Sequence, residues 1–413
     1  MNRTIVPVVV SASVLALAAC STAADPGAGE SSGGTTDLAA SITQLDGYTD
    51  GTSAEAWQSM LDECSDETGV AIERQSLPTS QMMPTILRQA SSRSMANLIF
   101  VDNPNVQQIA ATGALAPLDS LGLSADGYPD GIAAAGSYDG SLYGLAPGVN
   151  ALALFYNKDI LADAGVEPPT TWDELRAAAA ELTTGNTYGL SMALLPTEEG
   201  TWQFLPFFWG AGAELTDVGS DEAVEALTFV QGLFDDGSVS ASALNWNQAE
   251  AGDQFTAGQA AMTITGSWSV ANFDKAASVD YGIVPIPAAD GSAAPVALGG
   301  EVGVISQADD AEMAAAAAVL ECMTSPEHQT YWAEQHAYIP GQTAVAEEYG
   351  AATPTMQAFV DAVASARPRT DDLGEAYPTT STALIEAVQN ALTGQLSPAD
   401  ALNAAASSVS SGQ

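Results

Sequence analysis

Positive charge is scarce in this chain of 413 residues. Nine Lys and Arg stand against 51 Asp and Glu, which gives a net charge of −42. A surface this acidic repels the phosphates of nucleic acids and of anionic lipid headgroups. It also offers few guanidinium or ammonium groups to a phosphate or sulfate ligand. The composition therefore excludes nucleic acid as a credible partner, and the acidic residues are dispersed as on a strongly solvated surface.

Histidine is scarcer still, because His328 and His336 are the only two. No G-x-S-x-G, H-E-x-x-H, P-loop or G-x-G-x-x-G signature occurs in a supporting context. Catalysis by a His-assisted nucleophile therefore has little to build on. We predict no catalytic residue, no metal site and no cofactor. A glycoside hydrolase that uses two carboxylates stays an alternative, because acidic residues are plentiful and sequence gives no distances.

Long apolar runs are limited to one, Ile5–Ala19, which follows Arg3 and is too short to span a membrane as a helix. The run ends in Leu-Ala-Ala-Cys, which resembles a bacterial lipobox. Residues 1–19 are therefore expected to be a cleaved signal peptide, with lipid attached to Cys20. Residues 20–37 have the composition of a flexible tether. This predicts a protein held by lipid on the extracytoplasmic face of the cell membrane. The alternative is a plain signal peptide followed by an incidental cysteine.

Cysteine is also rare, with Cys64 and Cys322 left once Cys20 carries lipid. An even number of cysteines in an exported protein favours a disulfide between them over a metal site. The two histidines are not in zinc-ligand spacing with Cys322. The alternative is a pair of buried thiols.

The rest of the chain, about 375 residues, is long enough for two domains. It alternates strand and helix patterns, which favours an open α/β sheet with ligands at the carboxyl ends of its strands. Strands are expected at 70–78, 97–101, 151–156 and 260–268, and helices at 52–68, 83–91, 171–182 and 222–234. Thr171 and Glu174 predict a capping box. Trp268 follows Gly266 at a strand end, where its ring could pack inward or receive a ligand.

Several phrases together resemble one protein family. They are "ANLIFVDNP", "LFYNKDILADAGVEPPTTWDEL", "FTAGQAAMTITGSW", "LGGEVGVIS" and "YIPGQTAV". From residue 41 to about 408 the chain resembles the extracellular solute-binding proteins of carbohydrate ABC transporters, of the maltodextrin and trehalose type. The resemblance implies a two-lobed periplasmic-binding-protein-like α/β fold (type II) with the ligand cleft between the lobes. Lobe 1 would comprise 38–150 and 285–338, and lobe 2 would comprise 151–284 and 339–413.

The function implied by the resemblance is a receptor that closes its lobes on a sugar and delivers it to an ABC import permease. It would be a monomer and not an enzyme. A sugar site needs aromatic faces for C–H groups, and directed polar groups for hydroxyls. A second hypothesis keeps the fold and changes the solute to a polyamine or another cation.

The resemblance also implies where the ligand contacts lie. The matching positions are Tyr48, Asp50, Asp102, Asn103, Asn150, Trp202, Glu199 (or Glu198), Gly300 (with Gly299), Glu301, Trp268, Arg367, Arg369 and Tyr377. For some of these a structural role is the alternative: Trp202 in the core, and Arg369 paired with Asp371 or Asp372. The resemblance further places the helix that carries Cys322 in the same lobe as Cys64.

Overall fold

The computed structural model describes residues 37–49 and 51–412. The predicted signal peptide, Cys20, the tether up to residue 36 and Asp50 lie outside these residues. The described residues form one compact unit. Among the helices of the described residues, none has the length and apolar character needed to cross a bilayer.

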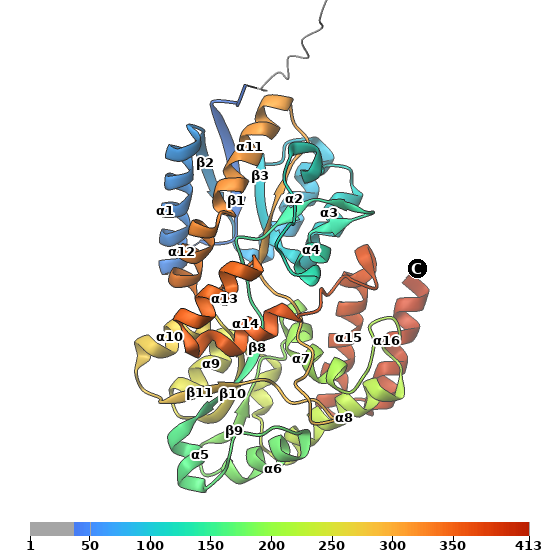
Figure 1. Ribbon diagram of the computed structural model, residues 1–413. Helices are drawn as coiled ribbons and strands as arrows, with labels where there is room; N and C mark the ends of the chain where they lie inside the picture. The colour runs from blue at the N-terminus through green and yellow to red at the C-terminus, as the bar shows by residue number, and fades with distance from the viewer. Residues whose placement is uncertain (1–36, 50, 413) are drawn as a thin grey trace, which may run out of the picture. The chain divides into compact units, whose positions relative to one another are not determined.

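The first sheet has five strands in the order β2-β1-β3-β12-β6. These are β2 (Ala71–Ser76), β1 (Ser41–Asp46), β3 (Leu98–Asp102), β12 (Glu301–Ile305) and β6 (Gly144–Leu145). Strand β1 runs parallel to β2 and β3, whereas β12 is antiparallel to β3 and β6. Its helices are α1 (Gly51–Thr68), α2 (Thr79–Ser92), α3 (Val106–Ala111), α4 (Asp130–Ala135), α11 (Asp310–Met323) and α12 (Pro326–His336) (Figure 1). A short hairpin is formed by β4 (Ser137–Tyr138) and β5 (Ser141–Leu142).

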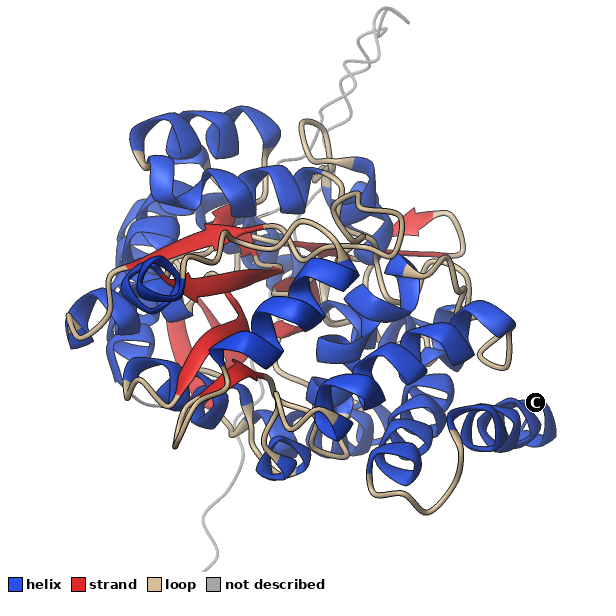
Figure 2. Cartoon of the chain, turned by 90° about the horizontal axis from the view of Figure 1, so that it is seen from below, coloured by secondary structure: helices blue, strands red, loops and turns tan. Residues whose placement is uncertain are grey.

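The second sheet has four strands in the order β11-β8-β10-β9. These are β11 (Tyr281–Val284), β8 (Leu152–Asn157), β10 (Ala260–Gly266) and β9 (Tyr188–Ser191). Figure 2 shows the strands of the molecule surrounded by helices. Strand β10 lies between β8 and β9, and every one of its residues is buried, which is consistent with its largely apolar sequence. The helices outside the first sheet are α5 (Lys158–Ala164), α6 (Trp172–Leu182), α7 (Glu198–Gly210), α8 (Asp221–Asp235), α9 (Gln248–Thr256), α10 (Ser269–Ala276), α13 (Thr343–Ala352), α14 (Gln357–Ala364), α15 (Tyr377–Leu392) and α16 (Pro398–Gly412).

The remaining elements are short. Single-turn helices cover Asn103–Asn105, Leu118–Leu121, Ala241–Leu244, Pro354–Met356 and Gly374–Ala376. Three chain segments cross between the sheets and are hydrogen-bonded to one another. Strand β7 (Gly148–Val149) pairs with β13 (Ile339–Pro340), and Asn150 bridges to Gly299. The strands of the first sheet fall within the ranges predicted for lobe 1, and those of the second within 151–284; the lobe boundaries themselves stay a prediction.

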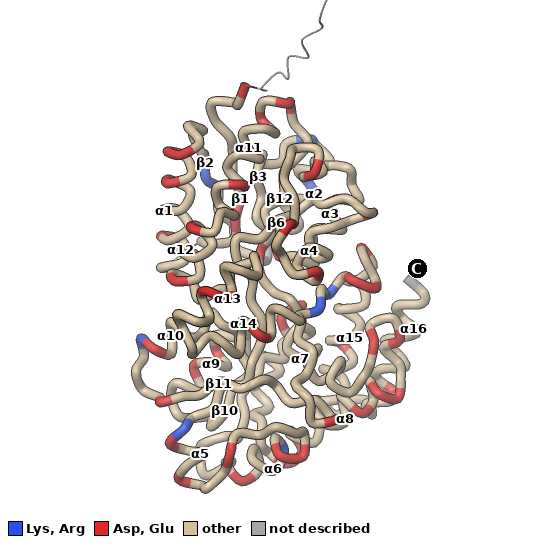
Figure 3. Tube along the Cα trace, viewed as in Figure 1, with Lys and Arg blue, Asp and Glu red and all other residues tan. Residues whose placement is uncertain are grey.

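Local sequence patterns explain most of these elements. Helix α6 begins where the Thr171 side chain accepts a hydrogen bond from the Glu174 amide. The predicted capping box is wrong in its second half, because the Glu174 carboxylate accepts from Thr170 and not from Thr171. The aromatic-rich segment from Trp202 to Trp209 forms the buried part of α7. Asp and Glu are distributed over the helices and loops around both sheets, as Figure 3 shows.

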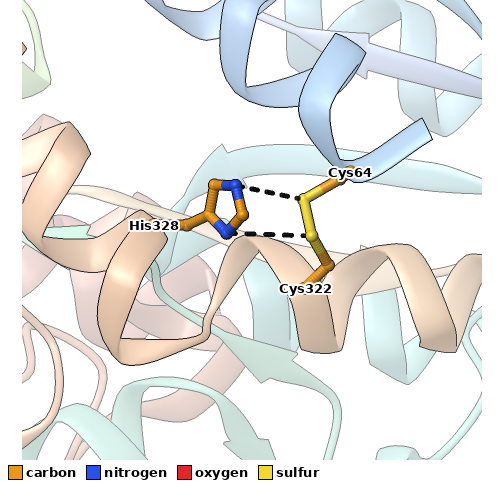
Figure 4. A group of neighbouring side chains, drawn as sticks. All are labelled: Cys64, Cys322 and His328. Atoms are coloured by element: carbon orange, nitrogen blue, oxygen red, sulfur yellow. Dashed lines mark hydrogen bonds between the residues drawn. A yellow bond between two sulfur atoms is a disulfide. The ribbon is translucent and has the colours of Figure 1, made fainter. Parts of the chain in front are cut away.

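Cys64 of α1 and Cys322 of α11 are joined by a disulfide, with their Cα atoms 5.7 Å apart. The histidine argument made from sequence spacing is wrong in one respect, because His328 lies beside both sulfurs. Its ring nitrogens are 3.9 Å from Cys64 Sγ and 3.7 Å from Cys322 Sγ (Figure 4). Sequence spacing missed this because the helix that carries Cys64 is 264 positions from His328. Sulfurs bonded to each other are not thiolate ligands, so the three side chains form a disulfide with a histidine beside it and not a metal site.

Candidate ligand-binding site

A cavity of about 460 Å³ lies where the strand ends of both sheets meet. Asp102 ends β3 and Glu301 begins the antiparallel β12, and the two are register partners. The antiparallel register therefore brings two carboxylates to one edge of the first sheet. From the second sheet's side come the first turn of α7, with Glu198 and Glu199, and Trp268 between β10 and α10.

Two tryptophans form the aromatic wall of the cavity. The rings of Trp202 and Trp268 are stacked, with centroids 5.5 Å apart and planes inclined by 22°. Trp202 is buried and donates its indole N–H to the Ala297 carbonyl at 3.2 Å. Trp268 is half-buried, and a Cβ added at Gly266 would lie only 1.8 Å from its ring. Glycine at the strand end therefore allows the Trp268 ring to fold back, and the ring packs and lines the cavity at once.

Arg369 joins the two sides of the cavity. Its guanidinium donates to Asp102 Oδ1 and to Glu198 Oε1, both at 2.7 Å, and its side chain is 3% exposed. The guanidinium also lies 5.7 Å from the centre of the Trp202 ring. Burial disfavours the charge on Arg369, but the two carboxylates outweigh burial and raise its pKa. The alternative pairing with Asp371 or Asp372 is wrong for this arginine.

Glu198 is held by further hydrogen bonds. The buried Tyr377 hydroxyl donates to Glu198 Oε1 at 2.6 Å, and the Ser381 hydroxyl donates to Oε2. Burial, with the nearby Glu198 charge, raises the pKa of Tyr377, which therefore stays protonated and remains a donor. Tyr377 thus contacts a cavity carboxylate from behind and is not itself among the lining residues.

Glu301 accepts two phenol hydrogen bonds on one oxygen. Tyr48 donates to Oε2 at 2.7 Å, and the Tyr338 hydroxyl lies 3.4 Å from the same atom. Burial raises the pKa of Glu301, while the hydrogen bond from Tyr48 lowers it and the charge of Asp102 raises it. Tyr338 lines the cavity, whereas Tyr48 does not. The Tyr48 ring packs on Trp57, at a centroid distance of 4.8 Å.

Two amide side chains lining the cavity have unpartnered atoms. Within the described residues nothing donates to Asn150 Oδ1, and nothing accepts from Gln248 Nε2, although both atoms are buried. A Cβ at Gly299 would lie 2.0 Å from Asn150 Oδ1, so glycine there leaves room for the Asn150 amide. Glu199 accepts the Gln248 backbone N–H, and burial raises the pKa of this carboxyl. Buried polar atoms without partners are unusual in proteins and are what a polar ligand would satisfy.

His336 also lines the cavity and has a neutral ring near pH 7. Burial lowers its pKa to about 4. Its Nδ1 is 2.8 Å from Ser53 Oγ, and its ring stacks on Trp332 with centroids 4.5 Å apart. Arg369 is thus the one charged basic side chain among the described residues that line the cavity.

Comparison with known proteins places this geometry in a family. The family model of the bacterial extracellular solute-binding protein matches residues 59–360. The chain belongs to this family. A cyclic alpha-maltosyl-1,6-maltose binding protein from Arthrobacter globiformis is 28% identical, with a TM-score of 0.77 over 90% of this chain and 98% of that one. A Thermotoga lettingae ABC transporter solute-binding protein bound with alpha-D-tagatose is 25% identical, with a TM-score of 0.79 over 90% and 99%.

One curated relative extends the range of ligands. The sn-glycerol-3-phosphate-binding periplasmic protein UgpB of Salmonella typhimurium is 29% identical over 212 residues, which are 47% of this chain and 48% of UgpB. The chain spans about half the length of the curated relatives it matches. Family membership shows a two-lobed extracytoplasmic solute-binding protein, and the family is one of binding proteins.

The structure of this solute-binding protein brings together most of the residues predicted for the site. The predicted residues that line the cavity are Asp102, Asn150, Trp202, Glu199, Glu198, Trp268, Gly299, Gly300, Glu301 and Arg369. Tyr48 and Tyr377 lie one contact behind it, on Glu301 and Glu198. Asp50 is outside the described residues.

Two predicted residues lie elsewhere. The buried Asn103 amide donates to the carbonyls of Leu298 and Gly300, at 3.2 and 3.1 Å, and so supports the loop before β12 from within. Arg367 pairs with Glu214 at 2.6 Å and stacks over Trp209, away from the lining. Sequence reasoning missed other lining residues, among them Ser53, Thr79, Gln248, Asn272, Gln335, His336 and Tyr338. Of these, Tyr338 carried a signal, because it lies in the matching phrase "YIPGQTAV".

Proposed function

We propose that this solute-binding protein is a lipid-anchored extracellular receptor that binds a sugar by lobe closure and delivers it to an ABC import permease. The stacked Trp202 and Trp268 at the cavity wall are the observation that carries this proposal. The C–H face of a pyranose packs on an indole ring, and its hydroxyls require donors and acceptors around it. Asn150 Oδ1 and Gln248 Nε2, one acceptor and one donor, suit such hydroxyls.

A neutral solute fits this cavity better than an anion. Among the described lining residues the one charged cation is Arg369, and both Asp102 and Glu198 already occupy it. A phosphate group of the kind named for UgpB would face several carboxylates, and among the described lining residues the one guanidinium nitrogen without a partner is Nε of Arg369. The structural neighbours that bind a cyclic maltosyl-maltose or tagatose support a sugar instead.

A thermal-shift screen over mono- and disaccharides, followed by calorimetric titration of the best ligand, tests the proposal. A ligand that binds only the folded state raises the melting temperature. Trp268→Ala should weaken sugar binding at least tenfold, a loss above about 1.4 kcal/mol. The matched control is Trp246→Ala, because Trp246 is half-buried and is not among the lining residues. Equal effects of the two substitutions, or no saccharide that binds, would contradict the proposal.

The location and the partners complete the proposal. Signal-peptide cleavage before Cys20 would leave lipid on that cysteine, and mass spectrometry of the membrane fraction should find an acylated N-terminal peptide. The protein would act as a monomer and would turn over no substrate. Incubation with oligosaccharides should release no reducing ends, whereas their release would favour the glycoside hydrolase alternative.

A further inference from the structure

Acidic side chains outnumber basic ones in the lining of the cavity. Four carboxylates line it, from Asp102, Glu198, Glu199 and Glu301. Arg369 neutralises only part of this charge, because its two terminal nitrogens are bound to Asp102 and Glu198. Glu199 and Glu301 have no cationic partner among the described residues. The cavity therefore has an uncompensated negative charge, and a ligand with excess donors would complement it.

A second observation places one acceptor site within this cavity. Asn150 is 3% exposed, and its Oδ1 has no donor among the described residues. Tyr338 lies beside both residues, because its hydroxyl is 3.4 Å from Glu301 Oε2 and the Asn150 amide N–H faces it, which partly offsets the rise that burial causes in the phenol pKa. Glu301 and the Asn150 side chain therefore lie beside one phenol, and both residues line the cavity. Glu301 has no cationic partner among the described residues, and Asn150 Oδ1 has no hydrogen-bond donor among them.

We propose that the preferred ligand is a saccharide with a protonated amine, whose ammonium group is bound by the Glu301 carboxylate and Asn150 Oδ1 while a sugar ring lies against Trp268. The inference rests on the proposed function, since it specifies the class of sugar that the same cavity binds. An ammonium group has three N–H donors and no acceptor, so it satisfies both atoms at once. A hydroxyl in its place provides one donor and no charge.

Charge pairing supplies the selectivity. Burial raises the pKa of Glu301, which reflects the cost of holding that carboxylate ionised without a cation. A ligand ammonium offsets this cost with a charge-assisted hydrogen bond, which is roughly twice as strong as a neutral one. An N-acetyl group at the same position keeps the size of the substituent but removes the charge. Amine, acetamide and hydroxyl versions of one saccharide therefore isolate the effect.

The experiment is calorimetric titration at pH 7 with matched saccharides. Each set has an amine, an N-acetyl and a hydroxyl member: glucosamine, N-acetylglucosamine and glucose, and the galactose and β-1,4-disaccharide counterparts. We expect the amine member of the best-binding set to bind at least tenfold more tightly than its two analogues. Glu301→Gln should remove this preference, and the control Glu347→Gln should retain it, because Glu347 is exposed and does not line the cavity. Glu199→Gln tests the carboxylate on the other side of the cavity, which is bonded to Gln248.

The outcomes separate this inference from the proposed function. Neutral saccharides that bind as tightly as the amines overturn the inference and leave the sugar receptor intact. If no saccharide of any set binds, both fail. Putrescine binding as tightly as the best amino sugar overturns the saccharide half of the inference. A preference lost in Glu199→Gln but kept in Glu301→Gln overturns the assigned position. The wild-type comparison needs no variant, so it decides the ligand class even if Glu301→Gln unfolds.

Discussion

Arg369 offers a direct test of how the two sides of the cavity are held together, because Arg367 is a control two residues away. Substituting Arg369 by Met removes a buried charge and leaves the carboxylates of Asp102 and Glu198 without their cation. Breaking a fully buried pair costs about 3–5 kcal/mol. Here Asp102 and Glu198 are 31% and 37% exposed, so water relieves part of the penalty. We expect the free energy of unfolding to fall by about 2–3 kcal/mol.

Urea denaturation followed by tryptophan fluorescence measures this loss. An unchanged slope of the unfolding free energy against urea concentration shows that the variant still folds and unfolds as the wild type does. Arg367→Met should cost at most about 1 kcal/mol, since its pair with Glu214 is far more exposed, at 29% and 48%. Adding Glu198→Gln to Arg369→Met should recover part of the stability, because it removes one of the two uncompensated charges. Equal losses for the two arginines would refute the reasoning, as would a double variant that recovers nothing.

Three further predictions concern the aromatic wall, the disulfide and pH. Gly266→Ala should displace the Trp268 ring, because its Cβ would lie 1.8 Å from that ring, and calorimetry should show at least a tenfold loss of sugar affinity; unchanged affinity would contradict this role of glycine. The double substitution Cys64→Ser/Cys322→Ser should lower the free energy of unfolding, measured in urea, by about 2–5 kcal/mol, because the disulfide closes a loop with a sequence separation of 258. A loss below about 1 kcal/mol would argue against a stabilising disulfide. The His336 pKa is lowered to about 4 in the folded state, so the unfolded state binds more protons between pH 6.5 and 4, and stability should fall by up to about 3 kcal/mol as pH falls through that range. His336→Gln should remove the His336 contribution to this loss of stability, which unfolding curves recorded at pH 6.5 and at pH 4 would reveal. An unchanged loss of stability in the variant would exclude His336 as its source.

The edge where the site lies could be predicted from local sequence, because strand ends are local features. The apolar run that forms β3 stops at Asp102, and β10 stops at Gly266 just before Trp268. Polar or aromatic residues directly after such runs lie at the edge of an open sheet, where ligands bind. Glu301 reaches the same edge only because β12 is antiparallel to β3. Strand direction cannot be predicted from a short pattern, and the family resemblance supplies only the position of Glu301 in the site.

Other parts of the site depend on contacts that no local pattern records. Arg369 meets Glu198 across 171 positions and Asp102 across 267. Arg367 and Arg369 are equal candidates from sequence, and long-range contacts separate them, because Arg367 pairs with Glu214 whereas Arg369 pairs with Asp102 and Glu198. The same limit applies to His328, whose place beside the disulfide follows from the packing of α1, α11 and α12. Long-range pairing of charged and polar side chains is therefore the part that sequence did not predict.

The chain has few basic residues, which explains why acidic side chains outnumber basic ones in its cavity. Exposed pairs such as Lys158–Asp280 contribute little and are screened by salt. Arg369 differs because it is buried and bound to carboxylates from both sides of the cavity. It joins the two sides and leaves only its Nε–H without a partner, whereas Glu199, Glu301 and Asn150 line the cavity with acceptors that no cation of the described residues pairs. An acidic protein that uses its one cavity cation as a structural link is therefore left with a site that favours ligands rich in donors.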